Sequence, residues 1–392
     1  MLIHTGFGEA LGNAYTALSH FPGIPIHYNT IRQCFEFRKT FANAATAIYL
    51  GIMATIMCAD CLLSTSDKSP LWKFIELFWT CAFAMAAHFN WVFFSEPRTT
   101  IAMFNSFVGM EKRMARVGYT YTPDRQTKMA KTACSFLMRP IVLSTILWGV
   151  GSIFLPCQPI NFFSIFMSQG FCNNSPIQTN FAITLFKFAV KTVLAIINGL
   201  TFYAAATSGI CCAVQIIVGV MCIRYNIKVF GKLAESPEIR IHTVIGYYRE
   251  IQILTGIFNS IHRSVLLHLL EAISLSQIFL GFISIRCGIS LGAGLPIPIF
   301  LLLVCSILAL QSVVVILVIY GLGSEAHTCS RKALQHVNSV RGFTRKAVGR
   351  RFIASCPCLK VDIGTRNFVE KDTSLNMVNF CTARIVDLLL LQ

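Results

Sequence analysis

Seven long runs of apolar residues divide the chain, and shorter polar segments that carry most of its charge separate them. A helix of about 17–25 apolar residues crosses the hydrocarbon core of a bilayer, and each run is of that order or longer. The runs lie at about 41–63, 71–94, 136–156, 188–223, 265–286, 296–321 and 373–391. The pattern predicts an all-α, polytopic membrane protein with seven transmembrane helices.

Apolar residues at helical spacing continue beyond several of these runs. Residues 98–118 keep the rhythm, so the second span is expected to continue as a helix out of the membrane. Residues 238–264 are amphipathic and meet the fifth span without a strong breaker, which predicts one helix of about 45 residues. Ser324 is a candidate N-cap for a separate basic helix over about 325–342.

The basic residues are divided very unevenly among the segments between the spans. Of 33 Lys and Arg, 26 fall within residues 1–40, 95–135, 224–264 and 323–372. Because basic residues favour the cytoplasmic side of a bilayer, these four segments are expected there. They share one side only if the N-terminus is cytoplasmic and the C-terminus is extracellular.

Composition supports this interpretation and narrows the function. Hydrophobic residues make up 55% of the chain and charged residues 13%, with a mean hydropathy of +0.63. The net charge of +16 flanks the spans, where it faces anionic lipid headgroups, so nucleic acid is not expected as a partner. The expected organisation is a cytoplasmic segment (1–40), six spans with long cytoplasmic helix extensions (41–322), a cytoplasmic anchor helix with a basic loop (323–372) and a final span (373–392).

The final span is the most polar of the seven. At about 100° per residue, its candidate pore-lining residues share one face within about 80°; they are Asn376, Asn379, Ala383 and Asp387. Such a stripe indicates either a water-filled pore or hydrogen bonding between helices of one bundle. Arg384 could pair with Asp387 or extend towards the interface.

Polar residues within two other spans are candidates for ligand contact. His88 and Asn90 lie in the second span and are candidate pocket residues, although a histidine satisfied within the core is the alternative for His88. Glu271 in the fifth span is placed to bond His268, one helical turn earlier.

The predicted outer loop between the third and fourth spans carries two further candidate sites. Cys157 and Cys172 stand at its two ends and could form a disulfide that closes it. Asn173 begins an Asn-Asn-Ser glycosylation sequence. Cys356 and Cys358 have no second ligand pair at metal-site spacing, so neither a metal nor a cofactor is expected.

Motifs for enzymatic chemistry are missing from the sequence, so an enzyme is not expected. A G-protein-coupled receptor would place its N-terminus outside the cell, against the distribution of basic residues. That class also carries Asp-Arg-Tyr and Asn-Pro-x-x-Tyr motifs, which the third and last spans lack. Two other functions are compatible with a seven-span protein of this kind. One is a metabotropic receptor that signals through a cytoplasmic partner, and the other is a small-molecule transporter.

Two stretches resemble the arthropod gustatory and odorant receptor superfamily, in particular its divergent springtail members. They are YYREIQILTGIFNSIHRSVLLHLLEA, beginning at Tyr247, and EKDTSLNMVNFCTARIVDLLLL, beginning at Glu370. The usual gustatory signature of the last span, Thr-Tyr followed by Gln-Phe, is replaced here by Thr373-Ser374 and Asn379-Phe380. The resemblance therefore assigns neither taste nor odour.

The resemblance implies a chemosensory, ligand-gated, non-selective cation channel. Its partners would be a small organic ligand, the lipid bilayer and related subunits in a homo- or heterotetramer at the plasma membrane of sensory neurons. The last span would line a shared pore, and the ligand would bind in the outer half of each subunit's bundle. Helices at about 238–264 and 325–345 would anchor the subunits together.

Overall fold

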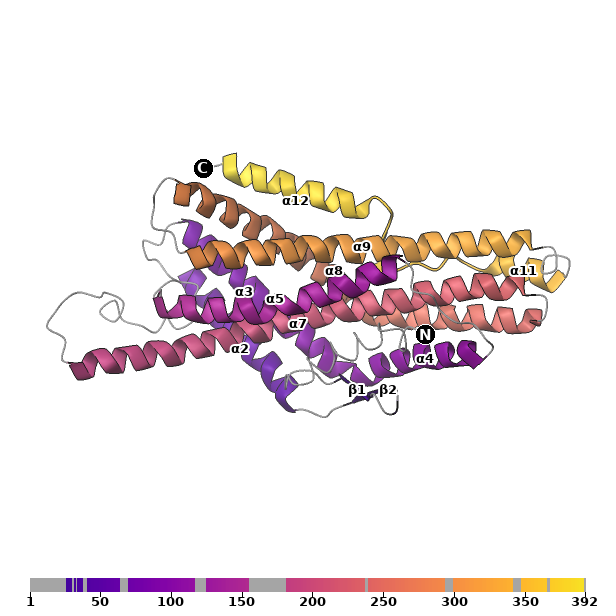
Figure 1. The fold of residues 1–392 in the computed structure, drawn as a ribbon, viewed down its shortest axis with the longest axis horizontal. Coiled ribbons are helices and arrows are strands. Elements are labelled where there is room, and N and C mark those ends of the chain that lie inside the picture. Colours follow the sequence, from indigo (N-terminus) through magenta and orange to yellow (C-terminus); the bar gives the residue numbers. More distant parts are fainter. Residues whose placement is uncertain are drawn as a thin grey trace.

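The protein is an elongated bundle of helices with two small β-hairpins (Figure 1). The computed structural model describes residues 26–29, 32, 34–37, 41–63, 70–116, 125–154, 181–236, 239–292, 299–340, 347–364 and 367–390. The helices are α2 (Phe41–Leu63), α3 (Pro70–Ser95), α4 (Pro97–Arg116), α5 (Arg125–Phe154), α7 (Phe181–Glu235), α8 (Ile241–Gly292), α9 (Ile299–Ser339), α11 (Ala347–Ser355) and α12 (Thr373–Leu390). The strands are β1 (Ile26–Asn29), β2 (Cys34–Phe37), β3 (Asp362–Ile363) and β4 (Asn367–Phe368).

The all-α fold class predicted from the apolar runs is confirmed. Seven helices coincide with the seven predicted spans, namely α2, α3, α5, α7, α8, α9 and α12. By length and apolar content, five helices of the described chain are able to cross a membrane alone, and α3 qualifies together with α4. Helix α12 falls outside that group because two asparagines, an arginine and an aspartate interrupt its apolar residues.

Three helices are much longer than a bilayer is thick. Helices α7, α8 and α9 have 55, 52 and 41 residues, which is about 60–80 Å at 1.5 Å per residue against a hydrocarbon core of about 30 Å. They run along most of the long axis of the molecule (Figure 1). The single helix predicted through residues 238–286 is therefore confirmed, and its amphipathic part projects beyond the span.

The second span does not continue straight into the following helix, so that prediction is wrong. Helices α3 and α4 meet at Glu96 with a bend of 69°. Pro97 explains the break, because proline lacks a backbone N–H and disfavours the helical conformation of the residue before it. Thr100 helps to hold the bend, since its hydroxyl donates to the Glu96 carbonyl at 3.1 Å.

A second correction concerns the sixth span. Ser324 does not begin a new helix, because α9 continues without interruption from Ile299 to Ser339. The Ser324 hydroxyl donates instead to the carbonyl of Gly321 at 2.9 Å. Serine is accepted within a helix when its hydroxyl bonds the preceding turn in this way.

The antiparallel hairpin of β1 and β2 was not predicted. Asn105 of α4 holds it in place, because its side chain accepts from the Phe35 N–H at 2.8 Å and donates to the Phe35 carbonyl at 2.9 Å. The Phe35 ring packs against Phe104, with 5.3 Å between the ring centroids. The hairpin thus depends on a contact with residues 70 positions away in the sequence.

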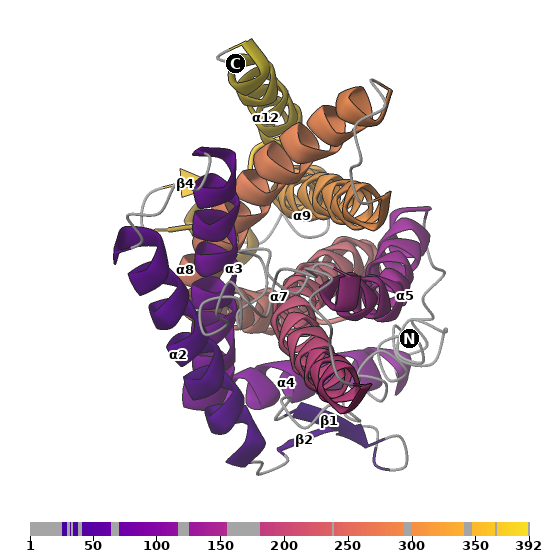
Figure 2. The same cartoon turned by 90° about the vertical axis from the view of Figure 1, so that its left-hand side faces the viewer.

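The end of the bundle that carries α11 has a dense core of α7, α8 and α9 side chains. Tyr248 and Phe230 are fully buried there, with ring centroids 4.6 Å apart. The segment before α12 is fixed to the same core, because the Tyr248 hydroxyl donates to the Pro357 carbonyl at 2.8 Å. The Asn259 side chain donates to the Lys360 carbonyl at 3.0 Å. Figure 2 shows α12 at the edge of the bundle, where it contacts α8 and α9.

Candidate ligand cavity and pore helix

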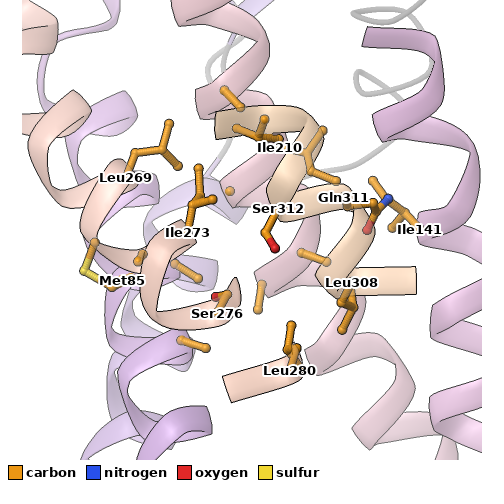
Figure 3. Close-up of a pocket in the computed structure, with 18 of the residues that line it drawn as sticks. Met85, Ile141, Ile210, Leu269, Ile273, Ser276, Leu280, Leu308, Gln311 and Ser312 are labelled. Atoms are coloured by element: carbon orange, nitrogen blue, oxygen red, sulfur yellow. The ribbon is translucent and has the colours of Figure 1, made fainter. Parts of the chain in front are cut away.

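A cavity of about 200 Å³ lies within the bundle, between α3, α5, α7, α8 and α9. Figure 3 shows its wall, with Leu269, Ile273 and Leu280 of α8 facing Leu308 of α9. Its lining includes no charged side chain, and four of its residues are polar: Ser144, Ser276, Gln311 and Ser312. The space is therefore suited to an uncharged, largely apolar molecule.

Aromatic rings form one end of the cavity. Trp79 and Phe202 line it and contact each other edge-on, and the Trp148 ring, which is not part of the lining, packs against both. The ring centroids of Trp79 and Trp148 are 4.6 Å apart, and those of Trp148 and Phe202 are 5.1 Å apart in a stacked arrangement. Because packed rings hold one another in place, this end of the cavity is expected to keep its shape when empty.

The polar lining residues differ in how far the protein already satisfies them. The amide of Gln311 donates to the Leu137 carbonyl at 3.2 Å, and the Ser312 hydroxyl donates to Gln277 Oε1 at 2.7 Å. Ser276 has no side-chain hydrogen bond to any residue that the structure describes. The oxygens of Ser276 and Ser312 are visible in Figure 3. Ser276 is thus the polar group best able to bond a ligand hydroxyl or carbonyl.

Small side chains create the space on α7. Ala205, Ala206 and Gly209 line the cavity, and small residues also allow helices to pack closely. Nearby, Gly149 of α5 and Gly199 of α7 do make such a packing contact, since a Cβ at Gly199 would lie 3.7 Å from the Gly149 Cα. One run of small residues therefore serves both purposes.

Neither of the two predicted pocket residues lines this cavity. Asn90 is 3% exposed, and its amide donates to the Ala86 carbonyl at 2.9 Å and to the Ser208 hydroxyl at 2.5 Å. His88 lies on an exposed face of α3, with its ring 5.4 Å from that of His268. The geometry gives Asn90 a clear role in joining α3 to α7.

The four predicted pore-lining residues of α12 are all exposed: Asn376, Asn379, Ala383 and Asp387. The buried residues of this helix are Cys381 and Ile385, which pack against Ile278 of α8. At about 100° per residue, the centre of the polar stripe lies about 180° from that buried face. Asn376, Asn379 and Ala383 therefore point away from the subunit's own bundle, whereas Asp387 stands at the edge of the stripe and lines the groove beside α8.

Charged residues lie beside the stripe. Arg384 donates to Asp387 at 2.8 Å, as the sequence suggested. Glu271 and His268 are in contact at 3.3 Å, again as expected, although both are exposed rather than turned into the bundle. Glu271, Arg384 and Asp387 line a groove of about 780 Å³ between α8 and α12.

The whole chain resembles two solved structures. The structure of the insect olfactory receptor OR5 from Machilis hrabei has a TM-score of 0.65 and 12% sequence identity, over 98% of both chains. The same receptor in complex with eugenol has a TM-score of 0.61 and 14% identity, also over 98% of both chains. This chain has the insect olfactory receptor fold. No family model and no curated protein sequence matches it.

The insect olfactory receptor fold agrees with the resemblance found in the sequence and accounts for all seven spans, including the polar α12. The remaining predicted residues, Cys157, Cys172 and Asn173, lie outside the described part of the chain. Among the described residues, no group of three or more His, Cys, Asp or Glu side chains is placed to hold a metal ion.

Proposed function

We propose that this protein is a chemosensory receptor subunit that forms a non-selective cation channel opened by a small organic ligand. The observation that carries the proposal is the separate location of the cavity and of the polar face of α12. An uncharged cavity lies inside the subunit, and a polar helix stripe points away from it. Amide and carboxylate groups facing lipid are costly, so the stripe of α12 requires water or another subunit.

A central pore satisfies that requirement most simply. If four subunits place α12 around one axis, Asn376, Asn379 and Asp387 of each face water, while Cys381 and Ile385 keep the helix attached to α8. The Arg384–Asp387 pair offsets the charge near the outer end, which suits a pore with little selectivity among cations. The long ends of α7, α8 and α9 would hold the subunits together on the cytoplasmic side.

The cavity defines the ligand class. A cavity of about 150 Å³ lined by apolar side chains accommodates benzene, so about 200 Å³ suits one ring with a short substituent. Sugars, amino acids and other charged or highly hydroxylated molecules would lose hydrogen bonds to water without replacement. A neutral odorant-like molecule fits this cavity better than a polar tastant, and the eugenol complex of the similar receptor supports this choice.

Patch-clamp recording of cells that express the protein tests the proposal. Asn379→Leu, within the stripe, should reduce the ligand-evoked current at least fivefold or change its cation selectivity, with normal surface expression. The matched control is Thr382→Leu, which changes an exposed polar residue about 100° from the centre of the stripe. Equal currents in both variants and the unmodified protein would place the stripe outside the conduction path.

An epitope at the C-terminus tests the proposed topology separately. Staining of intact cells is expected, because the distribution of basic residues predicts that the end of α12 lies outside the cell. An epitope reached only after permeabilisation would contradict the channel architecture and favour a receptor that acts through a cytoplasmic partner.

A further inference from the structure

Gln277 of α8 stands between the ligand cavity and the helix proposed to line the pore. Ser312, on the α9 wall of the cavity, shares its hydroxyl hydrogen between Gln277 Oε1 at 2.7 Å and the Ala309 carbonyl of its own helix at 2.8 Å. Gln277 is half-buried, and its side chain lines neither the cavity nor the groove beside α12. The amide therefore connects α8 and α9 behind the cavity wall.

The contact between α8 and α12 begins at the next residue. Ile278 packs against Cys381 and Ile385. At Gly281, one turn further along α8, a Cβ would lie 2.7 Å from Ile385 Cδ1 and 4.0 Å from Gln277 Nε2. Helix α12 thus rests directly on the α8 backbone, and the Gln277 amide lies beside that point of support.

One short segment of α8 therefore lines the cavity with one face and supports α12 with another. Ile273, Ser276 and Leu280 line the cavity. Ile278 and Gly281 support α12. Because close-packed interfaces change between discrete arrangements rather than deforming smoothly, a shift between α8 and α9 is passed to α12.

We propose that Gln277 is a positioning residue that couples the state of the cavity to the position of α12, through its hydrogen bond with Ser312. Occupancy of the cavity changes the distance between α8 and α9, and this change strains the Ser312–Gln277 hydrogen bond. The consequence for gating rests on the channel function proposed above, whereas the mechanical link is a property of the single subunit.

The link can be measured without ligand or current. A cysteine at Val386, which is exposed on α12 next to Ile385, reports the environment of that helix through its alkylation rate. Cleavage after Arg384 places this cysteine and the native Cys381 of α12 on different peptides, which mass spectrometry distinguishes. Ser312→Ala should change this rate at least threefold, whereas Ser312→Thr, which keeps the hydroxyl, should restore most of the original rate.

The decisive comparison is a double-mutant cycle with Gln277→Met, which keeps side-chain length and removes both amide atoms. Ser312→Ala is expected to have no further effect in that background. Gln252→Met, on the far part of α8, is the control and should leave the rate unchanged. If Ser312→Ala leaves the rate unchanged, or acts equally with and without Gln277, the coupling is refuted.

Addition of eugenol as a probe extends the test to ligand binding. Quenching of tryptophan fluorescence measures occupancy of the cavity in a protein whose Trp72 and Trp91 are replaced by phenylalanine, because Trp79 lines the cavity and Trp148 packs against it. Gln277→Met should leave the eugenol affinity within twofold and reduce the eugenol-dependent change in α12 alkylation at least threefold. An intact eugenol-dependent change in this variant would overturn the proposal. An intact coupling cycle in a protein that passes no current would instead refute the channel function alone.

Discussion

Replacement of Gly219 by alanine tests the packing of the two longest helices. A Cβ at this position of α7 would lie 2.2 Å from Phe258 Cε2 and 2.7 Å from its Cδ2. The Phe258 ring is fully buried and stacks on His262, with 4.5 Å between the centroids. Because the buried ring is held against His262, the added methyl group is expected to push α7 and α8 apart.

The expected magnitude follows from two opposing effects. Overpacking of a filled core costs about 1–3 kcal/mol, whereas alanine gains about 1 kcal/mol over glycine within a helix. Gly256→Ala on α8 isolates the second effect, because nothing lies within 4 Å of its Cβ position. We therefore expect Gly219→Ala to be less stable than Gly256→Ala by about 1–3 kcal/mol.

Equilibrium unfolding of the purified protein in mixed micelles, followed by circular dichroism during titration with dodecyl sulfate, measures this difference. Phe258→Leu provides the rescue, because the smaller side chain leaves room for the methyl group. The Gly219→Ala change should be at most half as costly in that background. If the two glycine variants shift the midpoint equally and in the same direction, the packing argument is wrong.

Two further changes test individual contacts. Asn90→Ala should lower stability by about 1–2 kcal/mol, because it removes the buried hydrogen bond that joins α3 to Ser208 of α7 and leaves that hydroxyl only the Ala204 carbonyl. The same variant should change the affinity in the eugenol binding assay less than twofold; a tenfold loss of affinity would identify Asn90 as a ligand contact. Burial raises the pKa of the Cys356 thiol to about 11, although Arg249 opposes the shift. Because the thiolate is the reactive form, alkylation of Cys356 at pH 8 should be about 100-fold slower than for a thiol of pKa 9.0 and should rise with pH up to about 11. Mass spectrometry against the denatured chain checks this, and equal rates in the two states would contradict the assigned burial.

Hydrophobic periodicity was sufficient to locate most of the helices. The expected spans 41–63, 71–94 and 373–391 agree with α2, α3 and α12 to within a residue at each end. Apolar runs determine these helices because the bilayer requires both their length and their internal hydrogen bonding. Pro97 by itself predicts a break at this point. The apolar residues that continue across it at helical spacing favour the straight helix that was expected.

The hairpin of β1 and β2 could not be predicted from the local sequence pattern. Its strands have four residues each, and an isolated two-stranded hairpin is at best marginally stable in water. Its support comes from Asn105 and Phe104 of α4. Only a tertiary contact makes this element stable, so its sequence alone carried little signal.

The residues that line the cavity could not be predicted from the sequence. Polar side chains within a span normally suggest function, which favoured His88 and Asn90. The α3 residues that line the cavity are instead Phe78, Trp79, Ala82, Met85, Ala86 and Phe89, at helical spacing. An apolar cavity has no polar signature, and its lining cannot be distinguished by sequence from an ordinary packed face.

The polar residues of α12 are evident in the sequence, and the structure shows which way that face of the helix points. In a bundle interior, its asparagines would have needed hydrogen-bond partners on α8 or α9. They lie on the opposite face, and Cys381 and Ile385 make the contact with α8 instead. A single subunit in a bilayer would expose that stripe to lipid at considerable cost. The channel assembly proposed above would remove that cost, because its water-filled axis would cover the stripe while Cys381 and Ile385 stay packed on α8.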